Sequence, residues 1–224
     1  MTRKAAILGG GVIGGGWAAR FLLMGWDVAV FDPDPQAERK IEAVLANARA
    51  ALPQLYDAAL PAEGRLSYAP TVEAAVDDAA WVQESGPERR DVKAAILGPA
   101  CAALTEGAVL GSSTSGFTPS SLQAGLPDPS RLVVAHPFNP VYLLPLVEIV
   151  AGEATAPAAV ETACTVLEGL GMKPLVVRRE IDAHIADRLL EAVWRESLWL
   201  IKDGVCTTEE LDDAIRYGFG LRWA

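Results

Sequence analysis

The stretch that decides the fold lies near the N-terminus, where residues 4–14 read Lys4-Ala5-Ala6-Ile7-Leu8-Gly9-Gly10-Gly11-Val12-Ile13-Gly14. A short apolar run is followed by a glycine-rich turn and by an apolar segment up to about Met24, which predicts a strand, a tight turn and a helix. Gly9, Gly11 and Gly14 fit the pattern G-x-G-x-x-G. Such glycines allow the turn, leave room for a pyrophosphate against the backbone and let the helix pack closely on the strand. The free N–H groups at the start of the helix favour an anion at the same place.

An acidic residue at the end of the second predicted strand supports this interpretation. Asp27–Phe31 is followed by Asp32, at the distance from the glycines where a carboxylate meets the adenosine ribose hydroxyls. A carboxylate accepts a hydrogen bond from the 2′-hydroxyl and repels a 2′-phosphate, and no arginine follows before Arg39. The alternative is a merely flexible loop, but strand, loop, helix and acid are all in register. We therefore predict NAD as the cofactor, bound by these residues: Gly9, Gly10, Gly11, Val12, Ile13, Gly14 and Asp32.

Strands and helices alternate along the chain as far as Arg179. After the first two strands, further strands are expected near Leu66–Tyr68, Trp81–Glu84, Ala108–Ser112, Leu132–Ala135, Leu146–Val150 and Pro174–Val177. Helices are expected between most of them, with Asp34-Pro35, Thr71 and Thr118-Pro119 as signals of helix N-termini. This alternation predicts an α/β fold in which a doubly wound, mostly parallel sheet forms a Rossmann domain over residues 1–179.

The pattern changes to purely helical over residues 180–224. Ala183–Lys202 is expected to form one helix that Gly204 ends, and Thr207-Thr208-Glu209-Glu210 is a capping box for another helix to about Tyr217. Trp194, Leu198 and Ile201 lie at helical spacing and predict an apolar face without a partner. We expect the start of a truncated, all-helical domain of a longer protein, which forms a homodimer when full length.

Composition narrows the function classes. The formal net charge of −10 argues against a nucleic-acid partner, because a phosphate backbone would be repelled. Apolar runs are too short to span a membrane, and the N-terminus lacks the apolar core of a secretory signal. Cys101, Cys164 and Cys206 are widely scattered, which argues against a disulfide framework and against a metal site. A cytoplasmic protein with a small-molecule substrate is the expectation.

Two histidines, His136 and His184, limit the choice of a general base. His136 follows the apolar strand Leu132–Ala135, at the carboxyl end where ligands bind in open α/β sheets. Oxidation of a hydroxyl needs a base for the alcohol proton, and an imidazole oriented by a carboxylate suits this task. Glu148, on the returning strand, is placed to be that carboxylate. On chemistry alone, a structural histidine that caps the strand beside an ordinary surface glutamate is an equally good interpretation.

The segments His136-Pro137-Phe138-Asn139-Pro140 and Leu146-Val147-Glu148 resemble the signature of the L-3-hydroxyacyl-CoA dehydrogenase superfamily. The resemblance extends over essentially the whole chain, including the glycine loop, Asp32 and Ser112–Ser115. It implies that His136 is the catalytic base, that Glu148 is its charge partner and that Ser115 hydrogen-bonds the substrate oxygen. It further implies that Asn139 lies beside that site and that Glu88 and Lys93 lie near the cofactor ribose and phosphates. The alternatives are a helix-capping Glu88, a solvated Lys93 and a Ser115 in a simple turn.

The identity of the substrate follows from finer features of the resemblance. The run from His136 to Glu148 is most similar to the carnitine-oxidising branch, which implies L-carnitine as the substrate. Two departures from the acyl-CoA branch agree with this: Asp187 replaces an asparagine, and Gln36–Leu60 is alanine-rich with few bases. Phe138, Tyr142 and Asp187, with Trp194 or Trp223, are candidates for binding a trimethylammonium group. The alternatives are a 3-hydroxyacyl-CoA or L-gulonate-type dehydrogenase, or an inactive NAD-binding or structural protein.

Overall fold

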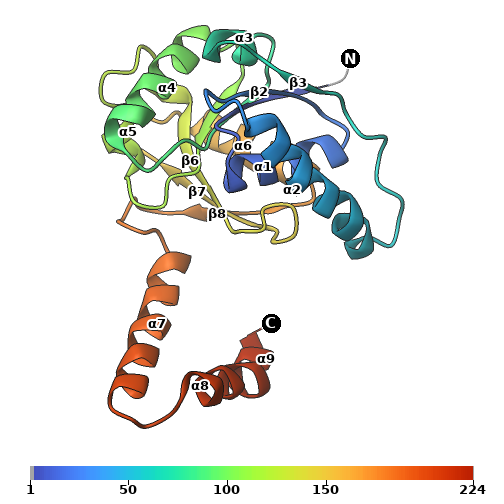
Figure 1. The fold of residues 1–224 in the computed structure, drawn as a ribbon. Helices are drawn as coiled ribbons and strands as arrows, with labels where there is room; N and C mark the ends of the chain where they lie inside the picture. Colours follow the sequence, from blue (N-terminus) through green and yellow to red (C-terminus); the bar gives the residue numbers. More distant parts are fainter. Residues whose placement is uncertain (1–2, 224) are drawn as a thin grey trace. The chain divides into compact units, whose positions relative to one another are not determined.

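The computed structural model describes residues 3–223, which fall into two compact units, Met1–Asp182 and Ala183–Ala224. Each unit is described by itself. The first contains all the strands found in the described residues, and the second is helical throughout (Figure 1).

An eight-stranded sheet forms the centre of the first unit, in the order β3-β2-β1-β4-β5-β6-β7-β8. The first six strands in this order, from β3 at the edge to β6, run parallel to one another. Strand β7 is antiparallel to β6, and β8 is parallel to β7. The prediction of a doubly wound, mostly parallel sheet is confirmed. The strands are β1 (Lys4–Leu8), β2 (Asp27–Phe31), β3 (Leu66–Tyr68), β4 (Trp81–Glu84), β5 (Val109–Ser112), β6 (Leu132–Pro137), β7 (Leu146–Ala151) and β8 (Lys173–Val177).

Helices cover both faces of this sheet because side chains of the buried strands alternate between two apolar cores. Ala5 and Ile7 of β1 belong to a core shared with α1, α2 and α6, whereas Ala6 and Leu8 belong to one shared with α3, α4 and α5. The helices are α1 (Val12–Leu23), α2 (Ala37–Ala51), α3 (Val72–Val76), α4 (Arg90–Ala103), α5 (Pro119–Gln123) and α6 (Pro157–Gly169), with 3-10 turns at Leu52–Leu55 and Pro129–Arg131. Thr71 caps α3 as predicted, its hydroxyl accepting the Ala74 N–H at 3.2 Å.

The start of α2 differs from the prediction. Asp34-Pro35 was expected to open this helix, but α2 begins at Ala37 with Gln36 as its N-cap. The Asp34 side chain accepts the Gln36 N–H at 2.9 Å and pairs with Lys40 at 2.6 Å. Asp34 therefore closes a turn ahead of the helix instead of capping its first residue.

The second unit consists of α7 (Ala186–Lys202), α8 (Thr208–Ala214), a π-helical turn (Ile215–Phe219) and α9 (Gly220–Trp223). The expectation that α7 begins at Ala183 is wrong, because Ala183 and His184 have positive φ angles of 60° and 49° and cannot continue a right-handed helix. Gly204, at φ +68°, ends α7 as predicted. The capping box also forms: the hydroxyl of Thr207 accepts the Glu210 N–H, and the Glu210 carboxylate accepts the Thr207 N–H.

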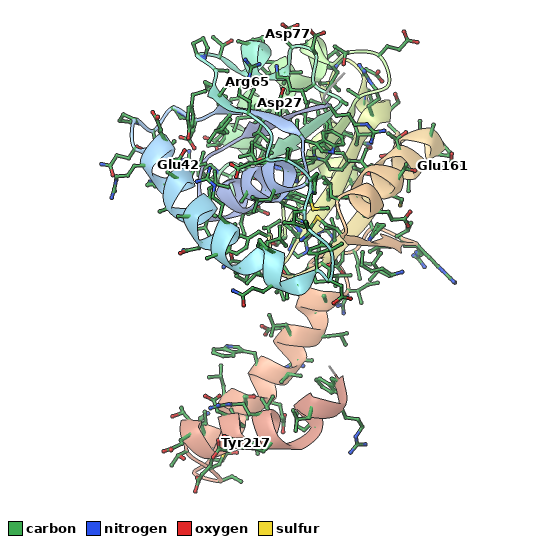
Figure 2. The ribbon with its side chains drawn as sticks, turned by 90° about the vertical axis from the view of Figure 1, so that its right-hand side faces the viewer. Asp27, Glu42, Arg65, Asp77, Glu161 and Tyr217 are labelled. Carbon is green, nitrogen blue, oxygen red and sulfur yellow. The ribbon has the colours of Figure 1, made fainter. Side chains whose placement is uncertain are left out.

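Most charged side chains lie at the surface, and a few are buried. Side chains such as Glu42, Arg65, Asp77 and Glu161 project from the surface of the first unit (Figure 2). Over residues 3–223, four side chains of Asp, Glu, Lys or Arg are buried: Arg20, Glu84, Lys93 and Glu148. In that same part of the chain, no helix is both long enough and apolar enough to cross a membrane.

Replacement of Gly14 tests the contact on which the first βα unit depends. A Cβ at Gly14 would stand 1.7 Å from the Gly9 carbonyl oxygen, whereas one at the neighbouring Gly15 would meet Val44 at an ordinary 3.4 Å. We expect Gly14→Ala to lower the free energy of unfolding by about 3 kcal/mol or more, and Gly15→Ala to change it by less than about 1 kcal/mol. Urea denaturation of the full-length protein measures both, and equal midpoints for the two variants would contradict this packing.

Candidate active site

Several predicted site residues of the first unit lie at one edge of the sheet, in loops or at strand ends. The glycine loop follows β1, Asp32 follows β2, Ser115 lies just beyond β5, and His136 is the penultimate residue of β6. Parallel strands end at the same edge, which is where open α/β sheets bind their ligands. The sheet therefore brings together residues that are far apart in the sequence.

The glycine loop has the shape that a phosphate group requires. Gly9 has φ +109°, and a Cβ there would stand 2.6 Å from the Ser85 carbonyl oxygen, while a Cβ at Gly14 would collide with Gly9. These two glycines therefore serve packing. Gly11, the N-cap of α1, has nothing within 4 Å of the position of a Cβ. Open space beside the free N–H groups of a helix N-terminus fits a cofactor pyrophosphate.

Asp32 is held at the end of β2 by the backbone. One of its carboxylate oxygens accepts the Gly10 N–H at 2.5 Å and the other accepts the Asp34 N–H at 2.7 Å. Each oxygen keeps a further lone pair, so the carboxylate retains capacity for a ribose hydroxyl. The nearest following arginine, Arg39, donates to the Gln36 side chain at 2.9 Å.

His136 and Glu148 form a cross-strand pair. They are register partners in the antiparallel pairing of β6 with β7, so their side chains leave the same face of the sheet. Nδ1 of His136 lies 2.9 Å from Glu148 Oε2, with 4% of His136 and none of Glu148 exposed. Because a carboxylate only accepts hydrogen bonds, Nδ1 carries the proton and Nε2 presents a lone pair.

Ser115 stands at that lone pair. Its hydroxyl oxygen is 2.9 Å from His136 Nε2, and the serine itself is exposed. The buried imidazole therefore lies next to solvent at an exposed hydroxyl group. The residues that the resemblance named as base, charge partner and substrate-binding serine are thus in hydrogen-bond contact.

Of the other predicted substrate residues, Phe138, Asn139 and Tyr142 follow His136 in the first unit, and Asp187 belongs to the second unit. The ring of Phe138 meets the His136 ring edge-on, with centroids 5.0 Å apart, and Asn139 is exposed next to it in the chain. Tyr142 is half-buried and packs against the larger core, and its predicted substrate contact stays a prediction. Asp187 lies in the first turn of α7 in the second unit, where it lines a cavity with Ala183, Leu190, Glu191 and Trp194. Its substrate role stays a prediction.

Glu88 and Lys93 belong to a network that also contains Glu84, which the sequence analysis did not identify. Lys93 is 1% exposed, so it is not a solvated lysine, and its ammonium lies 3.0 Å from Glu84 and 3.1 Å from Glu88. Burial opposes ionisation of Glu88, yet its pKa lies below the usual value because Thr114, the Gly116 N–H and Lys93 stabilise the carboxylate. The only signal for Glu84 in the sequence is a charged residue that ends an apolar strand.

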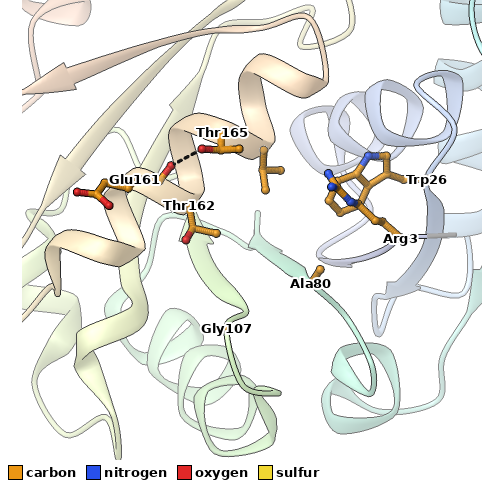
Figure 3. Close-up of a pocket in the computed structure, with 8 residues that line it drawn as sticks. Arg3, Trp26, Ala80, Gly107, Glu161, Thr162 and Thr165 are labelled. Carbon is orange, nitrogen blue, oxygen red and sulfur yellow. Dashed lines mark hydrogen bonds between the residues drawn. The ribbon is translucent and has the colours of Figure 1, made fainter. Parts of the chain in front are cut away.

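The hollow shown in Figure 3 is a different feature, at the opposite edge of the sheet. Arg3, Trp26, Ala80 and Gly107 lie just ahead of β1, β2, β4 and β5, and residues of α6 close the other side around a volume of about 450 Å³. Arg3 stacks over the Trp26 ring at 5.5 Å. None of the predicted site residues lines this hollow.

Comparison with known proteins adds the family. Residues 4–181 match the model of the 3-hydroxyacyl-CoA dehydrogenase NAD binding domain, and residues 184–224 match that of the 3-hydroxyacyl-CoA dehydrogenase C-terminal domain. The chain is 64% identical over 220 residues to an L-carnitine dehydrogenase/betainyl-CoA thioesterase of Ruegeria pomeroyi, covering 98% of this chain and 45% of that protein. It is 58% identical to an L-carnitine dehydrogenase of Mesorhizobium japonicum, covering 100% of this chain and 62% of the relative. The chain thus spans about half the length of these relatives.

Solved structures of dehydrogenases superpose on almost the whole chain. An NAD+-dependent 5-formyl-3-hydroxy-2-methylpyridine 4-carboxylic acid 5-dehydrogenase superposes with a TM-score of 0.90 at 32% identity, covering 99% of this chain and 72% of that one. A 3-hydroxybutyryl-CoA dehydrogenase of Escherichia coli superposes with a TM-score of 0.82 at 25% identity, covering 96% and 46%. The matched NAD binding domain confirms NAD, the cofactor predicted from the glycine loop and Asp32.

Cofactor affinity tests the role of Asp32. We expect NAD to bind much more tightly than NADP, and Asp32→Asn to weaken NAD binding about 10- to 100-fold, the equivalent of one charged hydrogen bond. Asp27→Asn, at the other end of β2, is the matched control and should leave both affinities unchanged. Isothermal titration measures them, and equal affinities for NAD and NADP in the unsubstituted protein would contradict the assignment.

Proposed function

The chain belongs to the 3-hydroxyacyl-CoA dehydrogenase family, and we propose that it is the dehydrogenase part of an enzyme that oxidises the 3-hydroxyl group of L-carnitine with NAD. The observation that carries the reaction type is the chain of contacts Glu148–His136–Ser115, which ends at an exposed hydroxyl on the cofactor-binding edge of the sheet. The names of the relatives supply the substrate.

His136 acts as the general base. Its Nε2 lone pair takes the proton of the substrate alcohol, and the positive charge that develops on the ring is stabilised by Glu148 at 2.9 Å. Since Glu148 is fully buried, water does not compete for this carboxylate or screen it. The pair thus fixes both the tautomer and the orientation of the base before substrate arrives.

Ser115 positions the substrate oxygen. Its hydroxyl is within 2.9 Å of His136 Nε2, so an alcohol oxygen that hydrogen-bonds Ser115 also comes within reach of the base. The glycine loop and Asp32 would hold NAD at the edge of the sheet where His136 lies, and the bound cofactor would supply the hydride acceptor for the carbon that carries this oxygen.

L-Carnitine carries a trimethylammonium group that cannot donate strong hydrogen bonds. An aromatic ring is a suitable contact for such a cation, and Phe138 is partly exposed beside His136. Asn139, exposed at the next position, offers an amide donor for the substrate carboxylate. Phe138 and Asn139 are therefore our candidates for the two charged ends of the substrate.

Removal of the base should cost catalysis and spare cofactor binding. We expect His136→Ala to lower kcat about 10²- to 10⁴-fold, the usual share of general-base catalysis, with NAD affinity unchanged. Glu148→Gln should lower kcat by a smaller factor, because a neutral amide no longer stabilises the imidazolium but the base itself remains. Steady-state kinetics of full-length variants measure both. If turnover is lost in His184→Gln instead, the other histidine is the base.

Substrate choice is tested with compounds that lack one recognition element. L-Carnitine should exceed 3-hydroxybutyrate in kcat/KM by at least about 10-fold, the range of a desolvated cation–π contact. Phe138→Leu should reduce this advantage, whereas Leu144→Ala, an exposed apolar residue of the same loop, should not. A preference for 3-hydroxybutyryl-CoA would overturn the carnitine assignment, and no turnover of any of the three would favour an NAD-binding protein without activity.

A further inference from the structure

A chain of buried charges lies behind the loop that carries Ser115. Glu84, the last residue of β4, is fully buried, and both of its carboxylate oxygens lie 3.0 Å from the ammonium of Lys93 in α4. The same ammonium is 3.1 Å from Glu88 Oε2. One buried lysine therefore joins two carboxylates, of which only Glu88 is exposed to solvent.

The Glu84 carboxylate accepts hydrogen bonds from three different residues. Its carboxylate accepts the Ser112 hydroxyl at 2.5 Å and the Gly86 N–H at 2.7 Å in addition to the two contacts from Lys93. Ser112 ends β5 and Gly86 lies just beyond β4, so this one side chain connects two strand ends with helix α4. A buried carboxylate with all of these partners is held in one position, because a displacement would break hydrogen bonds to a charge that water cannot reach.

Glu88 connects this buried cluster to the residues on either side of Ser115. Its Oε1 accepts the hydroxyl of Thr114 and the N–H of Gly116, at 2.8 Å for the latter. These two residues flank Ser115 on either side. The lowered pKa of Glu88 agrees with a carboxylate that accepts from both.

We propose that Glu84 and Lys93 are positioning residues that act through Glu88 on the turn 114–116 and hold the Ser115 hydroxyl at His136. Glu84 has no exposed surface and cannot touch substrate or cofactor, so its effect on the reaction must pass through other residues. Lys93 acts from within the protein, with its charge shared between two glutamates. The catalytic part of this inference rests on the proposed function.

A double-mutant cycle in the full-length protein separates positioning from general stability. Glu84→Gln should lower kcat about 10-fold or more while KM for NAD stays within about 3-fold. In a Ser115→Ala background, the same substitution should cost less than about 3-fold, because the group that it positions is already gone. Additive losses in the two backgrounds would overturn the proposal.

A second readout needs no substrate and so does not depend on the proposed activity. The chain contains two histidines, so histidine-selective ¹⁵N NMR of the ligand-free protein reports on His136 against His184 as an internal reference. Glu84→Gln should shift the His136 Nε2 resonance in the same direction as Ser115→Ala and leave His184 in place. A folded Glu84→Gln variant with an unchanged His136 resonance would contradict the proposal.

The neutral pair Glu84→Gln/Lys93→Met tests whether the cluster serves stability alone. In Glu84→Gln the buried Lys93 keeps only the exposed Glu88 as a counter-ion, whereas the double variant removes the buried ammonium as well. The double variant should therefore recover most of the unfolding free energy lost in Glu84→Gln, and it keeps the experiment possible if the single variant fails to fold. Its kcat should remain about 10-fold low, since Glu88 has lost its anchor. Return of kcat to the unsubstituted value would show that the buried charges contribute only to folding.

Discussion

The close approach of helix α1 to strand β1 is the contact on which the rest of the first unit depends. A side chain at Gly14 would meet the Gly9 carbonyl oxygen at 1.7 Å, and one at Gly9 would meet Ser85, so the turn closes only with glycine at both positions. Once it closes, the start of α1 lies at the carboxyl edge of the sheet, beside the loops that follow β2 and β4. The parallel strands then place Asp32, Ser115 and His136 at that same edge.

The contact between His136 and Glu148 depends on a departure from this parallel order. Strand β7 reverses direction next to β6, and the reversal makes Glu148 the direct partner of His136. Arg20 of α1 anchors the loop between β6 and β7, because its guanidinium donates to the Tyr142 carbonyl at 3.2 Å. It also donates to the carbonyl oxygens of Leu170 and Gly171 and to the Tyr56 hydroxyl. Burial lowers the pKa of Arg20, while the neighbouring Tyr56 hydroxyl partly offsets this. The same helix thus follows the glycine loop at its N-terminus and, through Arg20, anchors the loop between β6 and β7.

Much of this arrangement could be predicted from the sequence because its signals are local. Strand lengths, the glycine spacing, Asp32 and the alternation of apolar residues each depend on neighbours in the chain. The pairing of His136 with Glu148 was predicted from their positions on a strand and its return, helped by the resemblance. The start of α7 was predicted wrongly because Ala183 and His184 have positive φ angles, which alanine and histidine in a sequence do not indicate.

The network behind Ser115 could not be predicted for a related reason. Glu84, Lys93 and Thr114 come from β4, α4 and the loop after β5, and only the folded sheet brings them together. In the sequence, Lys93 follows closely on Arg89, Arg90 and Asp91, and this context gives no indication that its ammonium is buried. Tyr142 follows the His136 segment in the sequence, and its half-buried ring packs against the core, so its predicted substrate contact stays a prediction.

The fate of the hydrogen at C3 of the substrate tests the central claim most directly. Full-length protein is supplied with L-carnitine deuterated at C3 and with unlabelled NAD, and the recovered nucleotide is analysed by mass spectrometry. If His136 removes the alcohol proton while the C3 hydrogen leaves as hydride, each carnitine oxidised places one deuterium on the nicotinamide ring and releases one proton to solvent. Oxidation that leaves the nucleotide unlabelled, or no oxidation of carnitine by a folded protein that binds NAD, would contradict the account.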